Sequence, residues 1–191
     1  MSATAFMAQL QKDQEYQRKK ELFDAELQER VSVLRQAEQP IIADLRNAGV
    51  HVDSVWDLVN TAEPYPAALP ILLDHLQRGG YPDRVMESLG RALGVGPAAS
   101  VWETLRQLYL AAPGPGEEEG LAVALAASAT VDDLDALIAL LDETSRGSTR
   151  IHFLRPIKRV GGKRGLDVLT SLKDDPLFGK EARALLKSRA R

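Results

Sequence analysis

Cysteine is absent from this chain of 191 residues. Without a thiol, the chain has no disulfide framework, no cysteine nucleophile and no cysteine-ligated zinc site. Aromatic residues are scarce as well, at 5 %, although apolar residues together make up 45 % of the chain. The buried volume must therefore come mainly from Leu, Ala and Val, which suits thin layers of closely packed helices.

Long apolar stretches are also missing. No run approaches the roughly 18 consecutive apolar residues that a membrane-spanning helix needs. Residues 1–6 show no cationic segment that leads into an apolar run, as a secretory signal would. We therefore expect a soluble, cytoplasmic protein that has no membrane partner.

A repeat of 32 to 33 residues runs through most of the chain when hydrophobic positions are compared. Three rows of positions carry it: Leu69, Trp102, Leu134 and Leu166; Leu72, Leu105, Leu137 and Leu169; and Leu76, Tyr109, Leu141 and Lys173. A repeat of this period is typical of stacked helical units, because one unit cannot bury its apolar face without a neighbour. The sequence therefore predicts an all-α fold that is built as an array.

A long charged helix should precede the array. Apolar residues spaced four, four and three apart from Phe23 to Leu34 predict a helix over residues 1–39. Pro40 is expected to end this helix, because proline lacks the amide proton and crowds the preceding turn. Residues 40–64 should form an N-terminal cap of two short helices. The predicted short helices are residues 41–47 and 54–60, and the predicted helical pairs are residues 65–97, 98–131, 132–164 and 165–191.

Local signals mark the ends and the interior of several helices. Ser54 and Asp57 have the spacing of a capping box, in which each side chain bonds a free amide of the first turn. Ser100 and Glu103 repeat this spacing ahead of the second pair. Pro156 lies well inside the second helix of the third pair, which it should kink or shorten.

The likeness to a known repeat rests on an apolar first helix with a proline, an aspartate at the start of the second helix, and a closing Ala-Leu-Gly. The segments that carry it are residues 67–76, 82–85 and 90–94, with residues 175–176 and 181–186 matching the second half of another unit. These segments resemble the short bacterial HEAT-like repeat, also known as the PBS lyase HEAT-like repeat, over roughly residues 65–189. The resemblance implies a right-handed α-α solenoid of about four HEAT-like helical pairs, an armadillo-type fold, with the second helices on its concave side.

No catalytic or metal-binding motif can be identified in the sequence. His51, His75 and His152 are far apart, and none has a second ligand at helical spacing. The glycines of residues 161–165 lack the first glycine of a P-loop, and residues 114–120 are acidic where a phosphate cradle would be neutral or basic. We therefore assign no catalytic, metal-binding or cofactor-binding residue and expect a protein that is not an enzyme.

The net charge of −3 hides a strong asymmetry. Residues 144–191 contain 13 Lys and Arg against four Asp and Glu, a net +9, and residues 1–143 carry a net −12. This division indicates either a partner of definite sign at one end or a balance of the two ends within the monomer. The candidate partner-binding residues are the basic side chains of the second helices and of one turn: Arg84, Arg91, Arg150, Arg155, Lys158, Arg159, Lys163, Arg164, Arg183 and Lys187.

Two functions follow as hypotheses. The first is a non-enzymatic protein-interaction module, a scaffold or adaptor that holds a protein partner such as an acidic helix or tail on its concave face. The alternative is binding of a nucleic-acid backbone by the basic C-terminal half, since HEAT-like alkylpurine DNA glycosylases grip a duplex with a related fold. Their aromatic residues have few counterparts in the repeats, chiefly Trp102 and Tyr109, which the helical phase assigns to the core. The N-terminal helix can pair with a copy of itself, cap the first repeat or stay free, so the sequence leaves the oligomeric state open.

Overall fold

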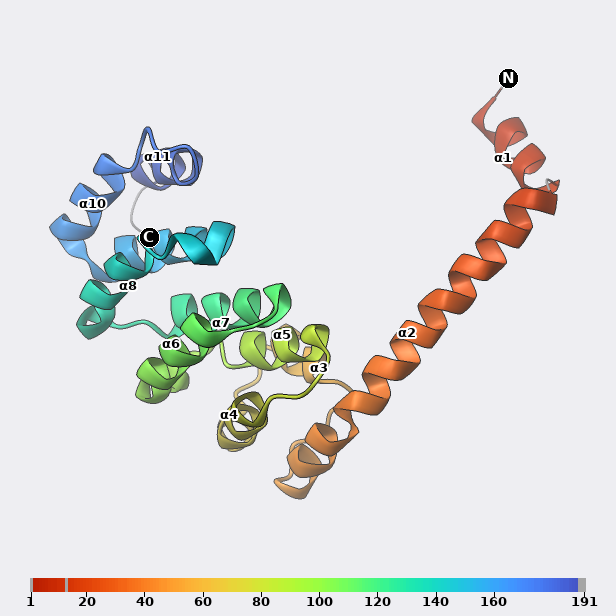
Figure 1. The fold of residues 1–191 in the computed structure, drawn as a ribbon, viewed down its shortest axis with the longest axis horizontal. Helices are drawn as coiled ribbons and strands as arrows, with labels where there is room; N and C mark the ends of the chain where they lie inside the picture. Colours follow the sequence, from red (N-terminus) through yellow and green to blue (C-terminus); the bar gives the residue numbers. More distant parts are fainter. Residues whose placement is uncertain (1, 13, 189–191) are drawn as a thin grey trace.

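The computed structural model describes residues 2–12 and 14–188, and within these residues it contains helices and connecting turns but no β-strand. The all-α prediction is therefore confirmed. Figure 1 shows a curved body of short helices from which one long N-terminal helix projects.

The projecting segment consists of α1 (Ala3–Lys12) and α2 (Gln14–Asn47). The prediction that Pro40 ends this helix is wrong, because α2 continues through Pro40 for a further seven residues. A proline inside a helix costs about 3 kcal/mol or more, since it removes one backbone hydrogen bond and crowds the preceding turn. Ile41 and Leu45, both fully buried at the base of α2, supply the apolar contact that offsets this cost.

A buried histidine fixes the base of α2 to the first helical pair. His75 is fully buried, and its Nε2 lies 3.0 Å from Oδ2 of Asp44 in α2. Its Nδ1 lies 2.6 Å from the Tyr81 hydroxyl. Both ring nitrogens thus have a partner, which a buried imidazole requires.

The short helix α3 (Val55–Asn60) follows as predicted. Ser54 is its N-cap, and the Ser54 hydroxyl accepts a hydrogen bond from the Trp56 amide at 3.2 Å. The Asp57 carboxylate accepts in return from the Ser54 amide at 3.0 Å, so the predicted capping box is confirmed.

Helical pairs make up the rest of the described chain. The pairs are α4 (Leu69–Arg78) with α5 (Asp83–Ala92), α6 (Trp102–Ala111) with α7 (Pro115–Ser128), α8 (Leu134–Leu140) with α9 (Leu154–Val160), and α10 (Gly162–Ser171) with α11 (Gly179–Lys187). Short 3₁₀ segments are η1 (Pro66–Ala68), η2 (Gly96–Val101), η3 (Val131–Asp133) and η4 (Thr144–Phe153), the last of which is interrupted by the non-helical backbone of Gly147. Figure 1 shows α4, α6, α8 and α10 in an outer row, and α5, α7, α9 and α11 in an inner row on the side toward the projecting α2.

Two local predictions within the pairs are wrong. Ser100 and Glu103 form no capping box, because Ser100 lies in η2, where its hydroxyl donates to the Pro97 carbonyl, and Glu103 binds Arg106. Pro156 does not kink a continuous helix. The chain instead forms η4 up to Phe153 and then begins α9, so Pro156 falls in the first turn, where its missing N–H costs little.

The boundary predicted between the third and fourth pairs falls inside α10, which begins at Gly162. Gly162 has a φ of 50°, a conformation that favours glycine, and it makes the turn from α9 into α10 short. A Cβ on Gly165 would lie 2.2 Å from the Ile157 carbonyl oxygen, so the two helices meet backbone to backbone. The turn therefore takes fewer residues than the repeat period suggested.

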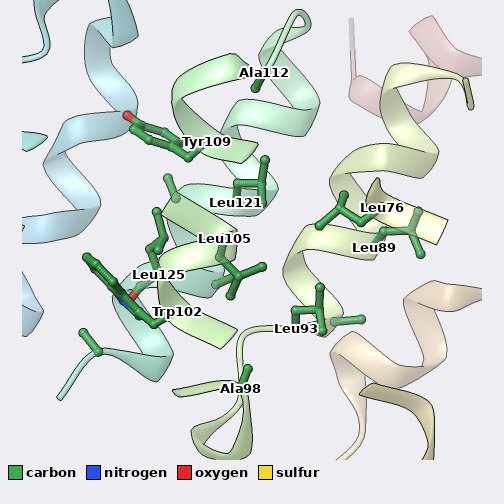
Figure 2. Packing of buried hydrophobic residues seen from close by; sticks show 14 of the residues in the cluster. Leu76, Leu89, Leu93, Ala98, Trp102, Leu105, Tyr109, Ala112, Leu121 and Leu125 are labelled. Carbon is green, nitrogen blue, oxygen red and sulfur yellow. The ribbon is translucent and has the colours of Figure 1, made fainter. Parts of the chain in front are cut away.

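The core runs between the two rows and follows the predicted periodicity. The row of leucines at 72, 105, 137 and 169 is fully buried in all four pairs. Figure 2 shows Trp102, Leu105 and Tyr109 of α6 lying close to Leu121 and Leu125 of α7. The indole N–H of Trp102 donates to the Leu125 carbonyl at 3.1 Å, which satisfies the one polar atom of that ring.

Candidate interaction surface

Asp83, the first residue of α5, connects the first two pairs. Its Oδ2 and Oδ1 accept hydrogen bonds from the backbone N–H groups of Gly116 (2.8 Å) and Glu117 (3.0 Å). These amides lie in the first turn of α7, where N–H groups lack partners within the helix and where negative charge is favoured. A Cβ on Gly116 would lie 2.8 Å from Oδ2 of Asp83, so glycine leaves room for the carboxylate. The aspartate of one inner helix thus caps the next.

A ladder of alternating charges crosses α5, α7 and η4. Glu87 accepts hydrogen bonds from Nη1 of Arg84 (2.5 Å) and from Nε of Arg91 (2.8 Å). Nη2 of Arg91 also donates to Oε1 of Glu119 at 3.0 Å, and the same oxygen lies 2.9 Å from Nε2 of His152. The side chains of Glu87 and Arg91 are only 11 % and 26 % exposed, so solvent screens them less than a surface pair. The ladder ties these three elements together.

A second polar cluster joins α6, α7 and η4. Arg146 donates to the carbonyl oxygens of Leu110 (2.7 Å) and Ala112 (2.9 Å) at the end of α6. Its Nη1 also lies 3.4 Å from Glu118, whose other carboxylate oxygen accepts from the Thr149 hydroxyl at 2.6 Å. Because these groups satisfy one another, we assign the cluster to the stability of the array.

A groove of about 750 Å³ opens beside the charge ladder, between α7, η4, α9 and α11. The apolar part of its lining is Val123, Ala126, Ala127, Ile151 and Pro156, and the polar part is His152, Arg155, Arg159 and Glu181. The Arg155 side chain is 78 % exposed, and its Nε donates to Glu181 at 3.2 Å. The groove therefore combines an apolar lining with a rim on which basic groups outnumber the one carboxylate.

Two predicted partner-binding residues of α9 bond the ends of neighbouring helices. Nη2 of Arg159 donates to the carbonyl oxygens of Ala126 (3.1 Å) and Ala129 (2.9 Å) at the end of α7. Nζ of Lys158 donates to the Leu185 carbonyl (2.5 Å) near the end of α11. A cation at a helix C-terminus satisfies free carbonyl groups and opposes the helix dipole. The Lys158 ammonium and one nitrogen of the Arg159 guanidinium are therefore used within the fold.

The remaining predicted residues are scattered. Arg150 and Arg183 each donate to a backbone carbonyl, and the Arg150 guanidinium also lies 5.2 Å from the centre of the Phe178 ring. Arg164, on α10 of the outer row, pairs with Asp135 at 2.5 Å. Lys163, on α10, and Lys187, at the end of α11, are exposed to solvent. The structure thus brings Arg84 and Arg91 together in the ladder and Arg155 and Arg159 together at the groove, and it places the others elsewhere.

The acidic members of this surface escaped the sequence analysis. Glu87 binds both Arg84 and Arg91, Glu119 binds Arg91, and Glu181 binds Arg155, all basic side chains that charge counting selected. Glu87 and Glu119 are 32 positions apart, which is the repeat period. A search for charged residues in the same register as the buried leucines would have found this pair.

Glu117 is a buried carboxylate beside Asp83 at the start of α7. Burial raises the pKa of Glu117 above its ordinary value, and the negative charge of Asp83 raises that pKa further. A raised pKa in the folded state means that ionisation opposes folding at neutral pH. This cost is complete above the folded pKa and disappears below the pKa of the unfolded chain.

We expect Glu117→Gln to raise the free energy of unfolding at pH 7, with the gain shrinking as the pH falls toward 4. Urea unfolding at several pH values measures the difference between the variant and the wild type. Glu103→Gln is the matched control, because a hydrogen bond from Arg106 lowers the pKa of the exposed Glu103. The control should lose a little stability at pH 7 and approach the wild type in acid. A gain for Glu117→Gln that does not depend on pH would contradict this account.

Across residues 2–12 and 14–188, no group of three or more His, Cys, Asp or Glu side chains is placed to hold a metal ion. In that same part of the chain, no helix combines the length and the apolar character needed to cross a membrane.

Comparisons with known proteins add no assignment. The chain matches no protein-family model, no curated protein and no solved structure. Its function must therefore be argued from its own residues.

Proposed function

We propose that the protein is a non-enzymatic interaction module that holds a partner helix in the groove between α7, η4, α9 and α11. The observation that carries this proposal is the combination of an apolar lining with a rim formed by His152, Arg155 and Arg159. A helix with one apolar face and flanking carboxylates matches both parts, because its face buries apolar surface and its charges meet the basic rim.

The architecture we propose is a right-handed α-α solenoid of four HEAT-like pairs. Support comes from contacts between neighbours: α5 packs against α4 and α7, α7 packs against α6 and α9, and α9 packs against α8 and α11. Arrays of this kind present extended surfaces on which partners bind. A cytoplasmic location remains part of the proposal.

Binding of a nucleic-acid backbone by the C-terminal half has less support. Phosphate binding depends on cationic side chains that can release counterions when they meet the ligand. Arg159 and Lys158 donate to helix-terminal carbonyls, and Arg155 faces Glu181. Lys158 is thus committed within the protein, and the apolar lining beside Arg155 and Arg159 has no counterpart in a phosphate backbone.

The test is site-specific capture of a partner from a lysate of the source cells. A photo-crosslinking residue at position 127 should trap a partner, and Ala126→Phe, which fills the groove, should abolish the trapped product. Arg164→Glu is the matched control, because it alters a basic side chain on the outer row and should leave trapping unchanged. Trapping that survives Ala126→Phe, or that is absent in the wild type, would refute binding in the groove.

A further inference from the structure

The N-terminal helices carry most of the exposed apolar surface of the described chain. Eight of its ten exposed large hydrophobic side chains lie on α1 and α2. On α2 they include Phe23, Leu27 and Val31, which are 65 %, 50 % and 39 % exposed. Isolated exposed apolar residues are ordinary, but a contiguous row of them indicates a surface that another molecule covers. We call residues 15–33 of α2 the arm.

The exposed row continues a face of α2 that is already buried. Phe23, Leu27 and Leu34 lie on one face at helical spacing, and Ile41 and Leu45 extend the same face into the core. The lower part of this face packs on the array, whereas Phe23 and Leu27 in the upper part are exposed. At 1.5 Å per residue, the arm offers about 30 Å of helix for a further contact.

The arm cannot reach the groove of its own chain. Figure 1 shows α2 as one helix that leads away from α7, α9 and α11. Docking within the same chain would require the helix to break between the arm and its buried base at Ile41. The helical conformation continues without interruption across that stretch. The surface that covers the arm must therefore belong to another molecule.

Two arms are poorly matched to each other. An antiparallel register that places Phe23 against Leu27 of the other copy also places Asp24 against Glu26. In a parallel, in-register pair, each charged side chain faces its own copy. Like charges held opposite one another work against association. The acidic middle of the arm, residues 21–29, is better matched to a surface of opposite sign.

That surface exists at the other end of the same chain. Residues 21–29 of the arm contain four acidic residues and no Lys or Arg, and they include Leu22, Phe23 and Leu27. We propose that the arm of one copy docks in the groove of a second copy, with Phe23 and Leu27 against Ala126 and its apolar neighbours and the carboxylates at the basic rim. This inference rests on the proposed function, since it names the partner helix that the groove holds.

The charges at the rim of the groove decide whether the groove attracts the acidic part of the arm. Arg155 and Arg159 are positive, Glu181 opposes them, and Glu119 already lies 2.9 Å from His152. Arg91 also pairs with Glu119, so three arginines stand against two carboxylates around the rim and the balance is positive. The whole C-terminal segment, residues 144–191, carries a net +9. The arm–groove contact joins two different surfaces, so it forms a closed ring or dimer where the geometry permits and an open chain otherwise.

The experiment measures mass in solution by light scattering over a range of protein concentrations. The wild type should show a mass that rises with concentration, to twice that of the monomer or more. Phe23→Asp with Leu27→Asp in the arm, and Ala126→Phe with Arg155→Glu in the groove, should each give a monomer. Gln28→Asp with Ser32→Asp adds the same charge to another face of the arm and should keep the wild-type mass.

A mixture of the two monomeric variants distinguishes docking of the arm in the groove from pairing of two arms. The arm variant keeps an intact groove and the groove variant keeps an intact arm, so the mixture should form a dimer with twice the monomer mass. A groove variant that still dimerises alone would show that arms pair with each other, and a mixture that stays monomeric would also overturn the inference. Should Ala126→Phe disturb folding, as judged by circular dichroism, Arg155→Glu alone at its exposed position serves as the groove variant.

A wild type that is monomeric at every concentration would also overturn the inference. That result would not touch the proposed function, because capture of a foreign partner at position 127 is read independently. If the arm–groove contact is confirmed but no foreign partner is captured at position 127, the groove serves self-association alone.

Discussion

Gly120→Ala should destabilise the protein by about 3 kcal/mol, although alanine favours helix formation over glycine by about 1 kcal/mol. A Cβ on Gly120 would lie 2.4 Å from the Glu87 carbonyl oxygen and 3.0 Å from the Glu87 Cα. On the opposite side, a Cβ on Gly90 would lie 2.5 Å from the Gly120 carbonyl carbon. The obstacles are backbone atoms, so no rotation of a side chain relieves the clash, and α5 and α7 must move apart.

Separation of α5 from α7 would also strain the contacts that cross the same interface. The Asp83 carboxylate caps α7, and Arg91 reaches Glu119, both across this interface. The measurement is urea unfolding followed by tryptophan fluorescence. Gly96→Ala is the matched control, because a Cβ there meets nothing within 4 Å, and it should be neutral or slightly stabilising. Equal stabilities of the two variants would show that α5 and α7 do not meet through their glycines.

The repeat of hydrophobic positions predicted the core residues because each helical pair buries equivalent positions. All four leucines of one row are fully buried, and Trp102 and Tyr109 occupy core positions as their phase required. The repeat predicts burial less well in the last pair, where Leu166 is 43 % exposed. No following helix within the described residues covers that position. A hydrophobic position is buried only where a neighbouring unit lies against it.

Predictions from single residues failed where packing outweighed local preference. Pro40 should end a helix, but the buried Ile41 and Leu45 hold the helix together beyond it. Pro156 causes no kink because the chain begins a new helix just before it. Local propensity is a small term compared with the burial of several apolar side chains, so it decides helix ends only where packing is indifferent.

Charge counting identified residues 144–191 as basic, but it did not show which of these cations are already bonded within the fold. Arg159 donates to carbonyl groups about 30 residues earlier in the sequence, which no local pattern reveals. Glu119 meets Arg91 and His152 only because three inner elements lie side by side. A surplus of cations in a sequence therefore overestimates the number available to a partner, whereas the apolar lining of the groove could not be assembled from sequence at all.

Phe153→Ala should lower the free energy of unfolding by about 3–5 kcal/mol. Phe153 is fully buried, and its ring meets the Tyr109 ring edge to face with centroids 5.4 Å apart. The Tyr109 hydroxyl lies 2.9 Å from the Thr149 hydroxyl, and burial raises the pKa of Tyr109 to about 12, so it stays protonated through the neutral range. These contacts join the second pair to the third.

Weakening one junction of an array has a consequence beyond the loss of stability. Neighbouring pairs support each other only through their shared interface, so a weak junction lets the two sides unfold separately. Both tryptophans, Trp56 and Trp102, precede the junction, whereas helices lie on both sides of it. In Phe153→Ala, circular dichroism should therefore show an early loss of helix that tryptophan fluorescence does not report. Phe153→Leu, which keeps most of the buried volume, should retain coincident transitions. A single coincident transition in Phe153→Ala would mean that the described helices unfold as one cooperative unit and that the proposal of a stacked solenoid needs revision.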